Sequence, residues 1–138
     1  MRLTQGAFSF LPDLTDEQIK AQVAYALSKN WAVSVEYSDD PHPRNAYWNL
    51  WGLPLFDIKD PAAVMFELAA CKKAKPNYYI KLTAFDNTRG TESSALSFIA
   101  QRPAVEPGFK LTRTDGHARQ IVYTIESYAC DKPSGARY

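Results

Sequence analysis

A chain of 138 residues is the usual size of one domain, and it can bury a hydrophobic core without a metal ion or a disulfide framework. Sixteen basic and fifteen acidic residues leave a net charge of only +1. This balance lacks the excess of positive charge that is typical of proteins that bind nucleic acid or an anionic membrane surface. The aromatic share of 13%, with three Trp and eight Tyr, is high, and such residues are enriched at surfaces shared with partners.

Apolar patterning and cysteine usage indicate a soluble protein of a reducing compartment. Met1–Phe10 lacks the pattern of a signal peptide, and no stretch approaches the ~20 apolar residues of a membrane span. Cys71 and Cys130 form no C-x-x-C pair and are too few for a disulfide framework. We therefore expect both thiols to stay reduced, with Cys71 buried on a helix and Cys130 beyond the last strand.

The first half of the chain predicts a helix followed by two strands. The T-x-x-Q spacing that begins at Thr15 is that of a capping box, and apolar residues then recur at helical spacing over Asp16–Lys29. Alternation over Trp31–Tyr37 predicts a strand with one buried face. Tyr47–Leu53 predicts a second strand, which should pair with the first as an antiparallel hairpin.

A second helix is expected from Asp60, a good N-cap, and Pro61, since Pro is favoured at the first helical position, and it should run to about Ala74. Phe66 lies off the apolar stripe that would face the sheet, and a helix apolar nearly all round is usually buried nearly all round. Phe66 is thus either a tolerated exposed residue or part of an interface with another chain.

The second half predicts four strands. Tyr78–Phe85 and Ala95–Gln101 are joined by a polar loop, and Phe109–Thr114 and Gln120–Tyr128 flank Asp115-Gly116, a common hairpin signal. The order favours an α+β fold, a two-layer α-β-β-α-β-β sandwich. It consists of a four-stranded antiparallel sheet with two helices on one face, plus a C-terminal β-hairpin extension.

These elements predict a single domain over residues 1–138. An N-terminal arm occupies residues 1–13, and the hairpin extension and tail occupy residues 104–138. Pro107-Gly108 supplies a break before the hairpin, so the four-stranded domain is expected to be complete at Pro103.

The sequence carries no recognisable catalytic, cofactor-binding or metal-binding motif. G-x-S-x-G, H-E-x-x-H, the P-loop and G-x-G-x-x-G are all absent. His42 lies in a proline-rich loop without a second cluster of ligands, and His117 follows the predicted hairpin turn. Asp86 and Glu92 could pair across a loop, although charged residues are ordinary there. We therefore expect no catalytic residue, cofactor or metal on this chain.

Aromatic and apolar residues are instead the candidates for contacts with other chains. Alternation places Tyr47 and Trp51 on one face of the second strand and Trp48 on the other, although the helices can cover only one face. The candidate interface residues are Tyr47, Trp48, Trp51, Phe66, Phe109, Leu111, Tyr123 and Ile125.

Short motifs along the whole chain carry a family resemblance. They are Ser9–Pro12, Leu14-Thr15, Glu17-Gln18, Tyr47-Trp48, Trp51, Leu53–Phe56, Lys72–Ala74, Pro76, Phe85–Arg89, Ser97–Ala100 and Arg102-Pro103. Together, in this order, they resemble the small subunit of form I ribulose-1,5-bisphosphate carboxylase/oxygenase (RuBisCO). The short loop Ser38–Asn45 and the hairpin beyond Pro103 are similar to the red-type branch.

The resemblance implies an assembly of eight large and eight small subunits that fixes CO2 in the Calvin cycle. The active sites, Mg2+ and the carbamylated lysine would belong to the large subunits. This chain would cap and stabilise the large-subunit octamer and influence turnover and CO2/O2 selectivity only indirectly. Four C-terminal hairpins would close a β-barrel around the four-fold axis. The location would be the bacterial cytoplasm, or the plastid stroma in a red-lineage alga.

Two alternatives remain open from the residues alone. One is a free-standing α+β module that binds a small molecule or a protein. The other is a small enzyme built on Asp86, Glu92 and a histidine. Co-purification with a large partner chain distinguishes the subunit from the free-standing module.

Overall fold

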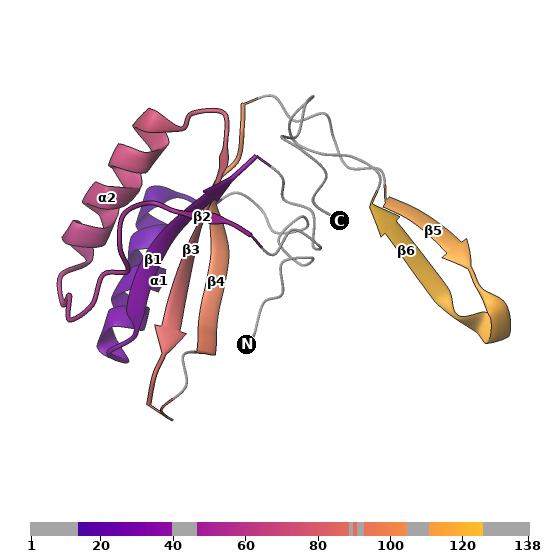
Figure 1. The fold of residues 1–138 in the computed structure, drawn as a ribbon, viewed down its shortest axis with the longest axis horizontal. Coiled ribbons are helices and arrows are strands. Elements are labelled where there is room, and N and C mark those ends of the chain that lie inside the picture. The colour runs from indigo at the N-terminus through magenta and orange to yellow at the C-terminus, as the bar shows by residue number, and fades with distance from the viewer. Residues whose placement is uncertain (1–13, 40–46, 89, 91–92, 105–110, 126–138) are drawn as a thin grey trace.

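The computed structural model describes residues 14–39, 47–88, 90, 93–104 and 111–125. Four antiparallel strands form a sheet in the order β2-β1-β3-β4, and both helices lie on one face of it (Figure 1). The elements are α1 (Asp16–Ser28), β1 (Ala32–Ser38), β2 (Asn49–Leu50), α2 (Pro61–Ala74), β3 (Tyr79–Asp86) and β4 (Ser93–Gln101). This arrangement confirms the predicted two-layer α+β sandwich.

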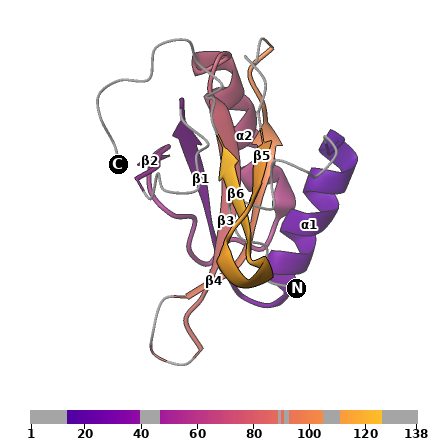
Figure 2. The same cartoon turned by 90° about the vertical axis from the view of Figure 1, so that its right-hand side faces the viewer.

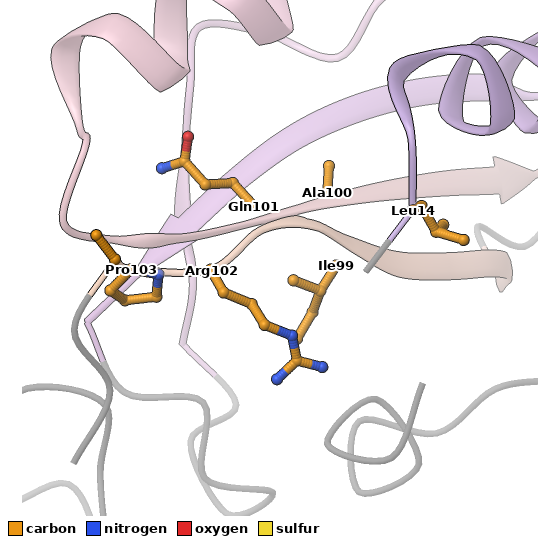
Figure 3. Close-up of a pocket in the computed structure, with 7 residues that line it drawn as sticks. Leu14, Ile99, Ala100, Gln101, Arg102 and Pro103 are labelled. Atoms are coloured by element: carbon orange, nitrogen blue, oxygen red, sulfur yellow. The ribbon is translucent and has the colours of Figure 1, made fainter. Parts of the chain in front are cut away.

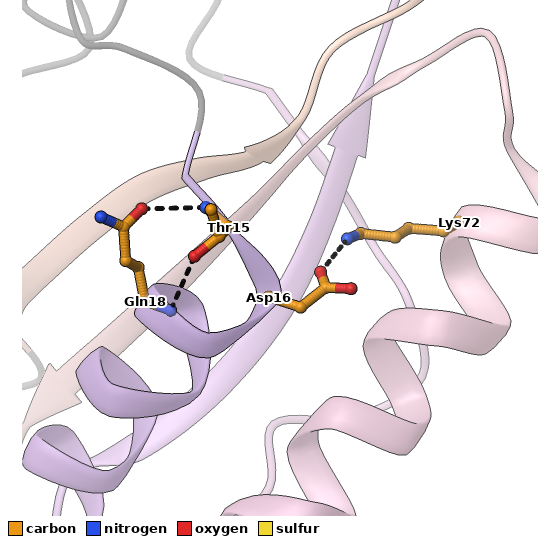
Figure 4. Close-up of polar contacts among 4 residues, drawn as sticks. All are labelled: Thr15, Asp16, Gln18 and Lys72. Atoms are coloured by element: carbon orange, nitrogen blue, oxygen red, sulfur yellow. Dashed lines mark hydrogen bonds and ion pairs between the residues drawn. The ribbon is translucent and has the colours of Figure 1, made fainter.

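Helix α1 begins and ends where its sequence signals predict. The Thr15 hydroxyl accepts a 3.3 Å hydrogen bond from the Gln18 backbone N–H, and the Gln18 side chain accepts one of 2.9 Å from the Thr15 N–H (Figure 4). This reciprocal pair is the predicted capping box. At the other end Asn30 has φ of 58°, and the N–H groups of Asn30 and Trp31 donate to carbonyls of the last turn. Left-handed Asn thus ends the helix.

Helix α2 starts at the predicted cap and is tied to α1. The Asp60 carboxylate accepts a 2.9 Å hydrogen bond from the Ala62 N–H, directly before Pro61 at the first helical position. The Lys72 ammonium lies 3.0 Å from the Asp16 carboxylate, which joins the last turn of α2 to the first turn of α1 (Figure 4). Because the Asp16 side chain is 77% exposed, this ion pair contributes little to stability.

Apolar side chains from both helices and the sheet form the core. Its buried members include Ile19, Val23, Val33, Val35, Val64, Leu68, Cys71, Leu82 and Phe98. Burial raises the pKa of the Cys71 thiol to about 11, and the nearby Lys75 ammonium opposes this shift. The thiol is therefore protonated and unreactive near neutral pH. Cys71 is free, as predicted, and Cys130 lies outside the described residues.

The second strand is much shorter than the predicted Tyr47–Leu53. Trp51 and Leu55 still donate backbone hydrogen bonds of 2.8 Å to carbonyls of β1. Between them, Gly52 has a left-handed φ of 70°, and Pro54 has no N–H to donate. The segment therefore follows β1 as an irregular edge, with regular pairing only at Asn49–Leu50.

Strand β1 is buried on both faces, so the prediction of one buried face was wrong. Val33 and Val35 contact the helices, whereas Ser34 and Glu36 point to the opposite face and are also buried. Burial of these polar groups is possible because each has a partner: the Ser34 hydroxyl donates to Glu36, and Glu36 is paired with Lys81.

The C-terminal extension is an antiparallel hairpin of β5 (Leu111–Asp115) and β6 (Ile121–Ile125). It forms a two-stranded sheet of its own, which Figure 1 shows apart from the four-stranded sheet and Figure 2 shows in front of it. The turn is not the expected tight Asp-Gly turn. Gly116 donates a 2.6 Å hydrogen bond to the Gln120 carbonyl, and a 3-10 turn that includes Ala118 at φ of 59° connects them.

The core and the outer face of α2 should respond very differently to truncation. Leu68→Ala removes a side chain that is 1% exposed and should lower the free energy of unfolding by about 2–5 kcal/mol. Phe66→Ala, at a side chain 72% exposed, should change it by less than about 0.5 kcal/mol. Urea unfolding of the full-length chain measures both. Equal losses would contradict the assignment of Phe66 to the surface.

Candidate interaction surface

The described residues do not gather polar groups into a reactive centre. No three His, Cys, Asp or Glu side chains among them lie close enough to hold a metal ion. Asp86 accepts a 3.0 Å hydrogen bond from the Thr88 N–H within its own loop, while Glu92 and His42 lie outside the described residues. His117 is exposed in the hairpin turn, as predicted. Over the same residues, no helix has the length and apolar content needed to cross a bilayer.

The sheet face opposite the helices carries a buried ion pair. Glu36 and Lys81 are register partners in β1 and β3, and the Lys81 ammonium lies 3.0 Å from the Glu36 carboxylate. Their side chains are only 11% and 12% exposed. The Ser34 hydroxyl donates a 3.0 Å hydrogen bond to the same carboxylate. The far face of the sheet therefore has a fixed polar centre.

Trp48 lies over this polar centre. The Lys81 ammonium is 4.4 Å from the centroid of the Trp48 ring, a distance at which a cation is attracted to the ring face. Leu50 pairs with Glu36 and so lies on the same face, where it is half exposed. Tyr47, which precedes Trp48, is 89% exposed. This segment presents aromatic and apolar surface on the face that the helices leave open.

Trp51 lies on the helix side, so the predicted separation of Trp48 and Trp51 onto opposite faces is confirmed. The Trp51 indole N–H donates a 3.2 Å hydrogen bond to the Glu67 carboxylate of α2. Its ring makes an edge contact with Tyr37 at a centroid distance of 6.4 Å. Trp51 is partly buried against the core, so part of its surface is already used within the chain.

The remaining candidate interface residues lie on α2 and on the hairpin. Phe66 projects from the outer face of α2 and is 72% exposed. Leu111 is the register partner of Ile125, and Tyr123 stands two positions away on β6. Because register partners and alternate residues share a face, these three positions fall on one face of the hairpin. Phe109 lies outside the described residues.

A recess of about 480 Å3 adjoins the end of β4 (Figure 3). Leu14, Ile99, Gln101 and Pro103 are among the residues that line it. Arg102, the charged residue among the described lining residues, already has an interaction partner. The Gln101 amide donates to the carbonyl of Lys75, which fixes the connection between α2 and β3 against β4. The recess therefore marks the end of the sheet rather than a set of converging reactive groups.

Known proteins match this chain in sequence and in fold. The family model described as "Ribulose bisphosphate carboxylase, small chain" matches residues 5–103. The RuBisCO small subunit of Porphyra purpurea is 69% identical and that of Porphyridium aerugineum is 70% identical, each over 100% of both chains. A solved structure of RuBisCO from Galdieria partita matches with a TM-score of 0.75 and 59% identity, again over 100% of both chains.

The chain belongs to the RuBisCO small-subunit family. The resemblance to the red-type branch is likewise confirmed, since the similar small subunits come from red algae and related algae. The family match ends at Pro103, two residues after β4, the last strand of the four-stranded sheet in chain order.

Sequence reasoning missed the polar features of this small subunit. In the sequence, Glu36 and Lys81 each have the pattern of an ordinary solvent-facing residue of an alternating strand. Nothing in the neighbouring residues indicates that the two form an ion pair. Pairing the predicted strands in register could have found them, since the two residues are direct partners. Glu67 was missed for the same reason, because its partner Trp51 comes from a different element.

Removal of one member of the buried pair should be costly. Lys81→Met leaves the Glu36 carboxylate buried without a cation and should lower the free energy of unfolding by about 3–5 kcal/mol. Adding Glu36→Leu should restore much of that loss, because an apolar pair needs no charge compensation. Lys72→Met, at the exposed pair, serves as the matched control and should cost at most about 1 kcal/mol. Equal losses in the free energy of unfolding for Lys81→Met and Lys72→Met, measured in urea, would contradict the stabilising role given to the buried pair.

Proposed function

We propose that this chain is a non-catalytic small subunit that caps and stabilises the large-subunit octamer of RuBisCO. The full assembly would contain eight large and eight small chains. The observation that carries the proposal is the identity of 69% to an algal RuBisCO small subunit over the entire length of both chains. A protein that binds only the assembled octamer stabilises that state by mass action.

The chemistry is assigned to the large subunit. Mg2+ and the carbamylated lysine would be held there, and no residue of this chain is given a catalytic or ligand role. Support comes from the described residues, where neither a metal-holding cluster nor a glycine-rich phosphate cradle is seen. The small subunit would influence turnover and CO2/O2 selectivity only through the geometry of the large subunit, by a coupling free energy between the two chains.

The exposed apolar side chains provide the means of assembly. Tyr47, Leu53 and Phe66 are 89%, 83% and 72% exposed, and they come from segments whose other side chains are anchored in the core. Aromatic anchors that become buried in an interface often contribute ~2 kcal/mol or more. Trp48 on the far face, the exposed Tyr47 next to it in the chain, Phe66 on α2 and the accessible part of Trp51 would therefore make separate contacts with neighbouring chains.

The hairpin would act between small subunits. A two-stranded hairpin is marginally stable alone in water, and its outer edges expose unpaired backbone groups. Four hairpins placed around a four-fold axis would pair those edges and close a β-barrel. Phe109, Leu111, Tyr123 and Ile125 would contribute to its interior. The separate two-stranded sheet of β5 and β6 supports this role, because it has no pairing partner among the described strands.

The proposed location is the plastid stroma. Similar small subunits, among them those of Porphyra purpurea and Porphyridium aerugineum, come from red algae and related algae. In that compartment this subunit would serve carbon fixation by the Calvin cycle.

Truncation after Pro103 tests the proposal. The shortened chain retains all of the four-stranded sheet and both helices, so it should keep its fold by circular dichroism. It should assemble poorly, because the contacts between hairpins are lost. Native mass spectrometry after co-expression with a large subunit measures the assembly. If the truncated chain assembles as fully as the intact chain, the proposed role of the hairpins in a β-barrel is contradicted. If the intact chain does not join a large subunit, the proposed function itself is overturned.

A further inference from the structure

A second recess, of about 250 Å3, lies between the irregular segment after β2 and helix α2. Most of its lining is apolar, and the charged residue among the described lining residues is Glu67. The described lining residues are Val35, Trp51, Gly52, Leu53, Pro54, Leu55 and Glu67. The hollow is smaller than the ~300–1,000 Å3 of sites that enclose small-molecule ligands, and this size suits a single side chain.

The Glu67 carboxylate is held in place by a hydrogen bond from another element. Its Oε2 atom accepts the 3.2 Å hydrogen bond from the Trp51 indole, and the edge contact with Tyr37 fixes that indole in turn. Within the part of the chain that the structure describes, no Lys or Arg forms an ion pair with Glu67. The carboxylate therefore stands preoriented at the wall of an apolar recess with one side open for a cation.

The surroundings of the recess are those of a protein interface. Leu53, on its rim, is 83% exposed, and Phe56 farther along the same segment is 58% exposed. When a partner covers such a rim, the carboxylate loses water and becomes costly unless a cation pairs with it. The partner must therefore bring a positive charge together with apolar surface.

An arginine meets these requirements better than a lysine. Its planar guanidinium can bind a carboxylate with two hydrogen bonds, stacks on aromatic rings and is less strongly hydrated than an ammonium. Arginine is also enriched at interfaces, where lysine is depleted. The aliphatic part of the arginine would lie against Leu53 and Leu55, and its head would lie between Glu67 and Trp51.

We propose that this recess receives one arginine side chain of the large subunit, paired with Glu67 and flanked by Trp51. The inference rests on the proposed function, since it takes the large subunit as the partner. It adds the site and the chemical group by which that partner is recognised.

Glu67→Gln tests the pairing, because glutamine keeps the size of the side chain and an oxygen acceptor for the Trp51 indole. The dissociation constant for assembly with the large subunit should rise at least about tenfold at low salt, and its dependence on salt should become weaker. Glu17→Gln, at an exposed residue of α1, is the matched control and should leave both unchanged. Glu67→Asp keeps the charge and should recover part of the salt dependence.

Chemical modification with p-hydroxyphenylglyoxal, which reacts with arginine, tests whether the cation that pairs with Glu67 is an arginine. One large-subunit arginine should be protected in the complex with the unaltered chain and modified in the complex with Glu67→Gln. If Glu67→Gln and Glu17→Gln assemble with the same affinity and salt dependence, or if no arginine is protected, the inference is overturned while the proposed function stands. If the unaltered chain does not join a large subunit, both are overturned.

Discussion

The central strands β1 and β3 present side chains to both faces of one sheet, and the two helices can cover only one of those faces. On the covered face, Val33, Val35 and Leu82 complete an apolar core with α1 and α2. On the other face the buried Glu36–Lys81 pair replaces apolar packing. An ion pair of this kind stabilises a fold no better than apolar residues of similar size, so its presence suits a face that must also remain compatible with water before assembly.

The fold holds several exposed or partly exposed aromatic side chains in fixed positions. Trp48 is held over Lys81, Trp51 is held by Glu67 and Tyr37, and Phe66 extends from a helix whose opposite side is locked in the core. Side chains that are already ordered lose less conformational entropy when they bind. The ordered aromatic side chains are therefore suited to contacts within a larger assembly, as the proposed role requires.

Local signals were sufficient for the helices and for most of the fold class. The capping box at Thr15 and the Asp60-Pro61 start act within a few residues, and each lies where it was predicted. Features that depend on distant partners were not predictable in the same way. The burial of Glu36 and the contact of Glu67 arise from pairing between separate elements. The shortening of β2 has a local cause, Gly52 and Pro54, which the alternation of the segment did not reveal. The candidate interface residues could be selected from their composition and alternation, but their exposure depends on the tertiary fold.

Hydroxyl-radical footprinting of the full-length chain, alone and assembled with a large subunit, tests the central claim most directly, since it reports the solvent exposure of individual aromatic side chains. Tyr47 and Phe66 are 89% and 72% exposed in the chain alone and should be oxidised readily. The account predicts that both become protected in the complex, while the core residue Phe98 stays protected in both states. Unchanged oxidation of Tyr47 and Phe66 in a verified complex would contradict the claim that the segment leading into β2 and the outer face of α2 are surfaces of assembly.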